Sequence, residues 1–178
     1  MFVVGENLKA LVEQHAVVDN PHSFDHSSLS LRLARQVKVL EPPADNDRSI
    51  VYGDDIPESW IKNKEIPDHG YLLKPYDCVL ACSIERINIP LGYLGFVQTK
   101  GSLARLFVTV HCCDAQIDPG FKGNVTFEIV NLGPLRVKLR VEQEVAQLFI
   151  AKTTTKAVVP YTGRYQDADG PTQFRKKL

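Results

Sequence analysis

The segment Leu135-Arg-Val-Lys-Leu-Arg-Val141 alternates apolar and basic residues from end to end. Successive side chains of a β-strand point to opposite faces, so this alternation predicts a strand with one buried and one solvated face. The segment from Leu29 to Ala34 has the same period, because three leucines alternate there with polar or small residues. Both segments indicate a chain built mainly from antiparallel strands.

Other strand candidates follow one another at short intervals, with turn residues between them. They cover residues 71–74, 78–84, 93–99, 106–111, 124–130, 145–151 and 157–160. Many short strands separated by turns predict an all-β fold, either a sandwich or a barrel.

Two regions depart from the strand pattern. Residues 6–17 carry Leu8, Leu11 and Val12 at helical spacing and predict a short N-terminal helix. Residues 41–69 contain several prolines among many charged residues. We expect them to form a long surface excursion with little regular structure.

The composition is that of one globular domain spanning residues 1–178, with 44% hydrophobic and 24% charged residues. Lys plus Arg and Asp plus Glu both number 21, so the formal net charge is zero. This balance provides no argument for a nucleic-acid or membrane partner. No charged segment leads into an apolar run, and no apolar stretch is long enough to cross a bilayer, so neither a signal peptide nor a membrane span is expected.

The four cysteines are Cys78, Cys82, Cys112 and Cys113. Two of them are adjacent, which is a poor framework for disulfides. We expect reduced thiols in a cytoplasmic protein.

The segment from Tyr161 onward is polar and contains Gly163, Gly170 and Pro171. This composition is typical of a mobile terminus, so we expect residues 161–178 to form a mobile C-terminal segment.

The motif Lys100-Gly-Ser-Leu-Ala-Arg-Leu106 has the residue types of a phosphate site. Gly101 allows close approach of the backbone, and the Ser102 hydroxyl and the Arg105 guanidinium can converge on phosphate oxygens. A turn that leads into a strand with one exposed arginine would have the same sequence, and on these residues alone it is the commoner case.

The motif Ile117-Asp-Pro-Gly-Phe-Lys-Gly123 predicts a tight turn at its Pro-Gly pair. Asp118 could orient a sugar hydroxyl or activate a water molecule, and Phe121 could lie against a deoxyribose. A hairpin turn whose aspartate binds its own backbone is the alternative interpretation.

Glu128 interrupts the apolar segment Asn124-Val-Thr-Phe-Glu-Ile-Val-Asn131. A carboxylate in such a strand can take a proton from water and return it to a leaving amine. An exposed glutamate on the solvated face of the strand is equally compatible with the pattern.

The cluster His111-Cys-Cys-Asp114 contains residue types that bind metals. Neighbouring side chains on a strand point to opposite faces, so these four cannot all reach one ion. The chain also lacks the H-x-E and P-C-x-x-C motifs of zinc-dependent cytidine deaminases. We therefore expect no zinc.

Taken together, these stretches resemble the dCTP deaminase family over nearly the whole chain. That family shows R-S-S-L-A-R-L, H-V-T-A, I-D-P-G-F/W-x-G, a strand with one Glu before N-x-G, A-Q-L, and P-Y-x-G-K-Y-Q. The matching segments here are Lys100–Leu106, His111–Asp114, Ile117–Gly123, Phe127–Gly133, Ala146–Leu148 and Pro160–Gln166. Upstream, Ser27–Leu33, Tyr71–Pro75 and Ile84–Pro90 also fit the family pattern.

The resemblance implies a distorted antiparallel β-barrel of the dUTPase-like β-clip type, with a short N-terminal helix. It also implies a homotrimer with sites at subunit interfaces. The substrate would be dCTP, hydrolysed to dUTP and ammonia for dTTP synthesis, with Mg2+ carried by the triphosphate and no zinc.

The resemblance further implies the role of each site residue. Glu128 would act as general base and acid on the water that adds to C4 of cytosine, and Arg105 matches a residue that contacts phosphates or shapes the site. Asp114 stands where the family has alanine, and we expect it to complete the catalytic set by accepting a hydrogen bond from the exocyclic amine. The resemblance also implies that the C-terminal segment, residues 161–178, acts as a mobile lid. The residues that match nucleotide contacts, or lie in this lid, are Lys100, Gly101, Ser102, Arg105, Asp118, Phe121, Gln147, Tyr161, Arg164 and Gln166.

Four positions in these motifs depart from the family pattern. Gly101 replaces a serine that helps to position the water, and Lys100 replaces an arginine. Cys113 and Asp114 replace a T-A pair that lines the amine pocket. Because of these departures, a nucleotide-binding relative that lacks the usual catalysis is an alternative interpretation of the chain.

A dUTP diphosphatase, alone or coupled to deamination, is a further alternative, because Asp118 matches the water-activating aspartate of dUTPases. Glu128 favours the deaminase, since dUTPases lack that residue.

Overall fold

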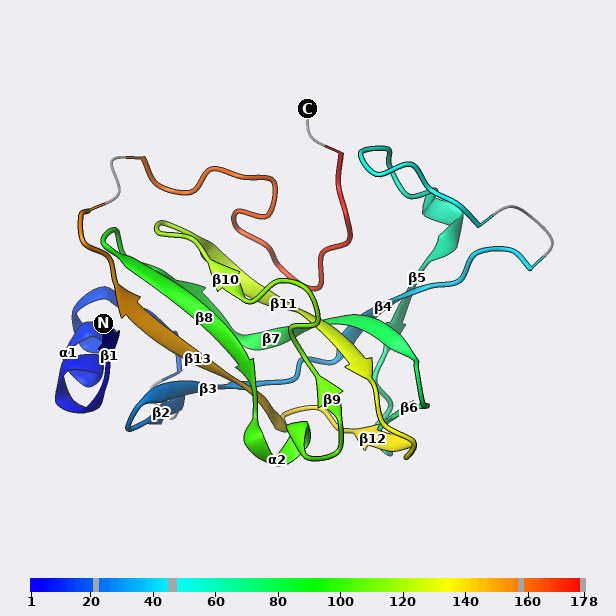
Figure 1. Cartoon of the computed structure of the whole chain (residues 1–178), viewed down its shortest axis with the longest axis horizontal. Coiled ribbons are helices and arrows are strands. Elements are labelled where there is room, and N and C mark those ends of the chain that lie inside the picture. Colours follow the sequence, from blue (N-terminus) through cyan, green and yellow to red (C-terminus); the bar gives the residue numbers. More distant parts are fainter. Residues whose placement is uncertain (21–22, 45–47, 157–158, 177–178) are drawn as a thin grey trace.

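The computed structural model describes residues 1–20, 23–44, 48–156 and 159–176. Within these ranges the chain forms three antiparallel β-sheets with two short α-helices at their margins (Figure 1). None of the helices in this part of the chain has the length and apolar character that a bilayer crossing needs.

The first sheet has six strands. Helix α1 (Gly5–His15) buries Leu8 and Leu11 and lies beside this sheet. The strand order is β10 (Gln116–Ile117), β8 (Tyr93–Thr99), β13 (Glu144–Lys152), β3 (Ser28–Arg32) and β2 (Phe24–Asp25), and β1 (Phe2–Val3) also pairs with β13.

The second sheet has five strands and carries most of the candidate site. Its order is β5 (Ile61–Glu65), β4 (Gln36–Leu40), β7 (Cys78–Asn88), β11 (Lys122–Asn131) and β9 (Val108–Thr109). A small third sheet pairs β12 (Val137–Leu139) with β6 (Tyr71–Leu73). The short helix α2 (Gly101–Ala104) follows β8, and the 3-10 helix η2 (Glu58–Trp60) precedes β5.

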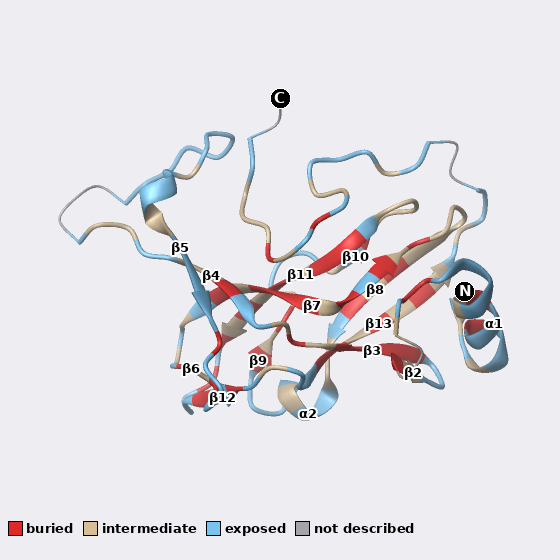
Figure 2. Ribbon diagram, turned by 180° about the vertical axis from the view of Figure 1, so that it is seen from behind, coloured by how far each residue is buried: buried red, intermediate tan, exposed pale blue. Residues whose placement is uncertain are grey.

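The core lies where the inward faces of the sheets meet, as the red segments of Figure 2 show. Phe127 of β11, Leu31 of β3 and Leu148 of β13 are fully buried there. Burial alternates with a period of two around Phe127 in β11 and Leu148 in β13, as the sequence pattern predicts, whereas β3 also buries Ser28 and Ser30.

The predicted all-β antiparallel fold with one N-terminal helix is confirmed. The described strands do not close into a barrel. Instead, the two larger sheets meet where the bridge between Leu33 and Ser83 continues the line of β3 toward β7.

The prediction of little regular structure across residues 41–69 was wrong at its C-terminal end, where η2 and β5 form. Strand β5 was missed because its sequence, Ile-Lys-Asn-Lys-Glu, has almost no apolar face. It pairs with β4 as an edge strand, where exposed lysines discourage pairing with other chains.

The strand predicted at 106–111 is reduced to β9. Phe107 adopts a left-handed backbone with φ of 59° and so forms a turn before the strand. The candidate at 157–160 falls partly outside the described residues, because 157 and 158 are not among them.

A register break interrupts the pairing of β11 with β7 between Asn124 and Thr126. Three residues of β7, from Ser83 to Glu85, lie opposite Val125 alone. The Asn124 side-chain amide donates to the carbonyl oxygens of Ser83 at 2.9 Å and Ile84 at 3.2 Å, and Val125 N–H donates to Ser83 Oγ at 2.9 Å. These bonds replace the ladder contacts that a bulge removes.

The same bulge turns Glu85 into the protein, where its side chain is fully buried. Arg32 Nε donates to Glu85 Oε1 at 2.7 Å, and Arg32 N–H donates to Oε2 at 2.8 Å. This ion pair connects β3 of one large sheet to β7 of the other. The pKa of Arg32 is raised, chiefly by its hydrogen bond to Glu85.

We expect Glu85→Ala to lower the free energy of unfolding by about 3 kcal/mol, because it leaves a partly buried guanidinium without its counter-ion. Asp68→Ala is the matched control, since it removes the exposed ion pair of Asp68 with Arg35 and should cost at most about 1 kcal/mol. Chemical denaturation of both variants measures the difference. Equal losses would show that the buried pair is not a major link between the sheets.

Candidate active site

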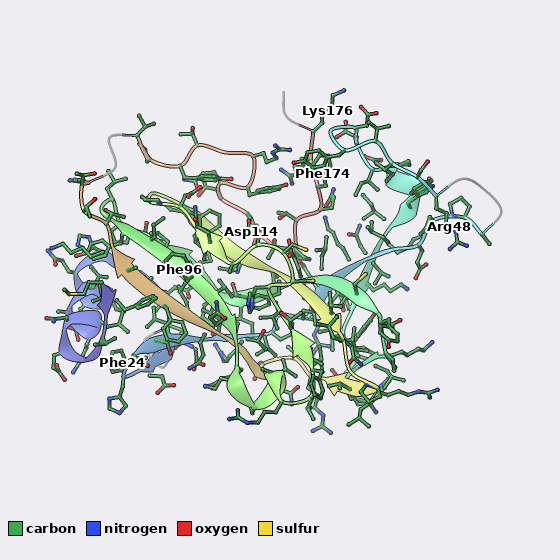
Figure 3. The ribbon with its side chains drawn as sticks, in the orientation of Figure 1. Phe24, Arg48, Phe96, Asp114, Phe174 and Lys176 are labelled. Atoms are coloured by element: carbon green, nitrogen blue, oxygen red, sulfur yellow. The ribbon has the colours of Figure 1, made fainter. Side chains whose placement is uncertain are left out.

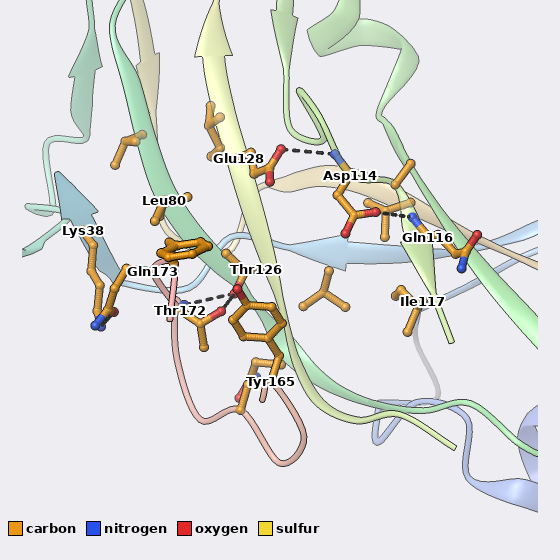
Figure 4. Close-up of a pocket in the computed structure, with 18 of the residues that line it drawn as sticks. Lys38, Leu80, Asp114, Gln116, Ile117, Thr126, Glu128, Tyr165, Thr172 and Gln173 are labelled. Carbon is orange, nitrogen blue, oxygen red and sulfur yellow. Dashed lines mark hydrogen bonds between the residues drawn. The ribbon is translucent and has the colours of Figure 1, made fainter. Parts of the chain in front are cut away.

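A cavity of about 490 Å³ lies between β11, the segment that precedes it and the C-terminal tail (Figure 4). This volume is within the usual range of small-molecule sites. Its acidic lining side chains are Asp114, Asp118 and Glu128, and its aromatic ones are Phe121, Tyr161, Tyr165 and Phe174. Five of the residues predicted from the sequence therefore meet in one place: Asp114, Asp118, Phe121, Glu128 and Tyr161.

Glu128 lies half-buried on the face of β11 opposite Phe127 and Ile129. Its Oε2 accepts hydrogen bonds from the N–H groups of Cys113 at 2.7 Å and Asp114 at 3.3 Å. These two donors hold the carboxylate in one orientation. Within the described part of the chain, the hydrogen bonds to this carboxylate all involve Oε2.

Asp114 is exposed at the cavity wall, and its carboxylate binds its own loop. Asp114 Oδ1 accepts the N–H of Gln116 at 3.1 Å, which closes a short turn of the Asx type (Figure 4). It is the main-chain N–H of Asp114, not its side chain, that reaches Glu128.

Asp118 is positioned by the side chain of Gln116, a residue that no sequence motif indicated. Gln116 Nε2 donates to Asp118 Oδ1 at 2.8 Å. The turn that follows requires Gly120, whose φ is 86° and whose Cα faces Pro160 so closely that a Cβ would lie 2.5 Å from the proline. This contact brings the start of the tail over Phe121, whose ring lies 5.9 Å from that of Tyr161.

The predicted phosphate-binding residues from Lys100 to Arg105 do not line this cavity. Figure 1 shows α2 at the opposite end of the molecule from the tail that covers the cavity. Arg105 Nη1 donates to the carbonyl of Gly101 at 2.7 Å and is exposed. Ser102 lies on the same exposed helix.

Lys100 and Gln147 are likewise engaged away from the cavity. Lys100 Nζ binds Glu144 Oε2 at 2.7 Å, and this contact lowers the pKa of the Glu144 carboxyl. Gln147 Nε2 donates to Ser28 Oγ at 3.0 Å across the six-stranded sheet. Within one chain the site residues therefore form two separate groups.

The tail follows the edge of β11 that β7 leaves free. Asn124 N–H donates to the carbonyl of Ala168 at 2.9 Å, and Thr172 N–H donates to Thr126 Oγ1 at 3.0 Å. The amide of Gln166 bridges the turn before β11, because it accepts from Lys122 N–H and donates to the Gly120 carbonyl, both at 2.9 Å.

The end of the tail contacts the excursion before η2. The ring of Phe174 lies 5.9 Å from that of Tyr52, and Lys176 N–H donates to Asp55 Oδ1 at 3.0 Å (Figure 3). Arg164 places its guanidinium over the rings of Tyr165 and Phe174, at 5.7 and 5.6 Å. The tail is thus docked on its own chain and forms one wall of the cavity.

Comparison with known proteins identifies the family of this chain. The family model described as dCTP deaminase-like matches residues 2–153, which is most of the chain. This chain belongs to the dCTP deaminase-like family.

Two relatives show how far the family likeness extends. A dUMP-forming dCTP deaminase of Halobacterium salinarum is 40% identical over 109 residues, 59% of this chain and 56% of that protein. The chain therefore matches little more than half the length of that relative. A dUMP-forming dCTP deaminase of Streptomyces avermitilis is 30% identical, with 100% of this chain and 96% of the relative aligned.

A solved structure shows the same fold. The crystal structure of 2'-deoxycytidine 5'-triphosphate deaminase from Agrobacterium tumefaciens superposes with a TM-score of 0.62 over 84% of this chain. The superposition covers 47% of that chain, and the sequences are 16% identical.

His111, which begins a motif shared with this family, lies beside Glu128. Its Nδ1 is 3.3 Å from Thr99 Oγ1, and its backbone forms a bridge with Glu128. Burial lowers the pKa of His111, while the charge of Glu128 opposes that shift. The neutral imidazole is therefore favoured in the folded protein.

We expect the neutral state of His111 to make stability depend on pH. The unfolded chain takes up this proton first, near pH 6.5, so its contribution is fully present above that pH and is lost as the pH falls. The difference in free energy of unfolding between wild type and His111→Gln should therefore shrink from pH 8 to pH 5. Denaturation at both pH values, with the exposed-histidine variant His69→Gln as control, provides the measurement. A difference that grows on acidification would contradict the prediction.

Proposed function

We propose that this protein hydrolyses the exocyclic C–N bond of dCTP, with Glu128 as the proton-transfer group. The observation that carries the proposal is the Glu128 carboxylate, held by two backbone N–H groups at the wall of a 490 Å³ cavity. The names of the relatives support the substrate.

In the proposed deamination, Glu128 takes a proton from a water molecule as the water oxygen adds to C4 of cytosine. The same carboxyl group then gives a proton to the exocyclic nitrogen, and ammonia leaves as the C4 carbonyl forms. The second hydrogen of the water ends on N3 of the uracil ring. One water is consumed, and the triphosphate is unchanged at this stage. Anchoring one carboxylate oxygen leaves the other free to carry the proton in both steps.

We propose dUMP rather than dUTP as the product that the protein releases. Asp118 lies in the same cavity as Glu128 and is oriented by Gln116, so a second carboxylate is available to activate water for attack on the triphosphate. That step would convert dUTP and water to dUMP and diphosphate. Both relatives named above are described as dUMP-forming.

The proposed reaction uses Mg2+ that arrives on the triphosphate of the substrate. It uses no zinc held by the protein.

We further propose a homotrimer in which each site combines residues of two subunits. The support is the separation of the site residues within one chain. Glu128 and Asp118 line the cavity, whereas Arg105 directly follows α2, which lies at the opposite end of the molecule from the tail that covers the cavity. A neighbouring subunit can supply the exposed Arg105 to the triphosphate of a nucleotide bound in this cavity.

We expect Glu128→Gln to lower the turnover of dCTP by about 10²–10⁴-fold, because the amide keeps the shape but cannot carry a proton. Nucleotide binding should stay within about tenfold. Chromatography of the products of dCTP and dUTP, with wild type and variant side by side, is the measurement. Conversion of dCTP by wild type to dUMP supports both steps, and dUTP alone supports only deamination. If neither nucleotide yields a product, the proposed deamination is wrong and a nucleotide-binding role replaces it.

The trimer proposal predicts complementation between two inactive variants. Glu128→Gln lacks one half of the site and Arg105→Ala lacks the other, so random assembly of an equal mixture should restore roughly a quarter of the sites. The activity of the mixture is measured after co-refolding or co-expression of the two chains. A Glu128→Gln and Arg105→Ala double variant, carrying both changes in one chain, is the matched control. Activity no higher than that control would show that Arg105 and Glu128 do not act across an interface.

A further inference from the structure

Two adjacent exposed thiols, Cys112 and Cys113, belong to the loop that holds Glu128. Cys113 N–H donates to Glu128 Oε2 at 2.7 Å, and Cys112 N–H donates to the Glu128 carbonyl at 3.4 Å. The two thiols follow one another directly along the chain, in the bend after His111. The proposed mechanism uses the backbone of this loop and leaves both sulfur atoms without a role.

We propose that Cys112 and Cys113 form a dithiol site for trivalent arsenicals, and that filling this site releases Glu128 from the N–H that orients it. Thiol sulfur is a soft donor and prefers soft, polarisable centres. An arsenoxide, R–As=O, condenses with both thiols. Two As–S bonds form, the arsenoxide oxygen leaves as water with the two thiol hydrogens, and arsenic stays trivalent.

The backbone geometry favours this reaction over a disulfide between the same residues. Consecutive Cα atoms are about 3.8 Å apart across a trans peptide, whereas an ordinary disulfide needs about 4.4–6.8 Å. An S–S bond between Cys112 and Cys113 would therefore strain the peptide between them. A bridging arsenic atom inserts one large atom between the sulfurs and relaxes that constraint.

Closure of the second As–S bond makes the site selective for arsenicals over reagents that react with a single thiolate. Burial raises the pKa of Cys112, and the Cys113 thiol adds to this shift, so reagents that need a single thiolate react slowly there. After the first As–S bond forms, the second thiol is already beside the arsenic, and its attack is intramolecular.

The ring that the arsenical closes includes the peptide whose N–H binds Glu128. Pulling both sulfurs onto one atom changes the torsions on either side of that peptide, so the 2.7 Å bond to Oε2 should be lost. An effect on turnover follows only if Glu128 acts as proposed above, whereas capture of the arsenical does not depend on it.

The remaining two cysteines serve as controls. Cys82 is buried, and burial raises the pKa of its thiol to about 11, so it should not react. Cys78 is exposed on the neighbouring strand β7 and is the alternative second thiol for Cys112. Its removal separates the two possible pairs.

The test is intact-mass measurement of the full chain after treatment with phenylarsine oxide and removal of excess reagent. We expect one adduct per chain, reversed by ethanedithiol but not by mercaptoethanol. Cys112→Ser and Cys113→Ser should each abolish the adduct, while Cys78→Ser and Cys82→Ser should retain it. An undiminished adduct in Cys113→Ser, loss of the adduct in Cys78→Ser, or no adduct on wild type would each overturn the site.

A second measurement on the same samples tests the link to Glu128. The adduct should lower dCTP turnover by about 10²-fold, and ethanedithiol should restore it. An adduct with unchanged turnover would overturn the link to Glu128 but not the dithiol site. A wild type that turns over no dCTP would overturn the proposed function, and the mass result would still decide whether the dithiol site exists.

Discussion

The pairing of β11 with β7 across a register break is the constraint on which the rest of the structure depends. A strand pair can contain extra residues on one strand only if the backbone N–H and C=O groups that lose their ladder hydrogen bonds find other hydrogen-bond partners. Asn124 and Ser83, both buried, supply those partners. The bulge in turn directs Glu85 toward Arg32, which ties the second sheet to the first. A buried polar network of this kind is stabilising only when all its members are satisfied.

Strand β11 also organises the candidate site, because its free edge receives three different segments. The tail pairs near Asn124, the loop of Cys113 binds Glu128, and β9 pairs at Val130. Each segment covers one part of this edge, and the cavity lies on the same side of β11 as the three segments. An edge covered in this way is protected from pairing with other chains, and it places Glu128 between the tail and the loop that orients it.

The charges of the two groups of site residues are complementary. The cavity presents the carboxylates of Asp114, Asp118 and Glu128, which suit proton transfer but repel a triphosphate. The cationic group on α2 lies elsewhere, and in a single chain Lys100 is neutralised by Glu144. The proposed trimer rests on this separation, because a second subunit would bring the cations beside α2 to the triphosphate of a nucleotide bound in the cavity.

The sequence by itself determined the strands and the residues that could do chemistry. Alternation of apolar and polar residues is local, so it revealed β8, β11 and β13 closely, and the motifs around Asp114, Asp118 and Glu128 named the three acidic residues that line the cavity. Strand β5 was not predicted, because its formation depends on pairing with β4 and not on an apolar–polar pattern of its own. Only the tertiary structure decided which partners the site residues have. Glu128 is held by main-chain N–H groups, which leave no trace in side-chain identity, and Lys100 is paired with Glu144, 44 residues away. Such contacts are set by packing between distant segments, and no local pattern encodes them.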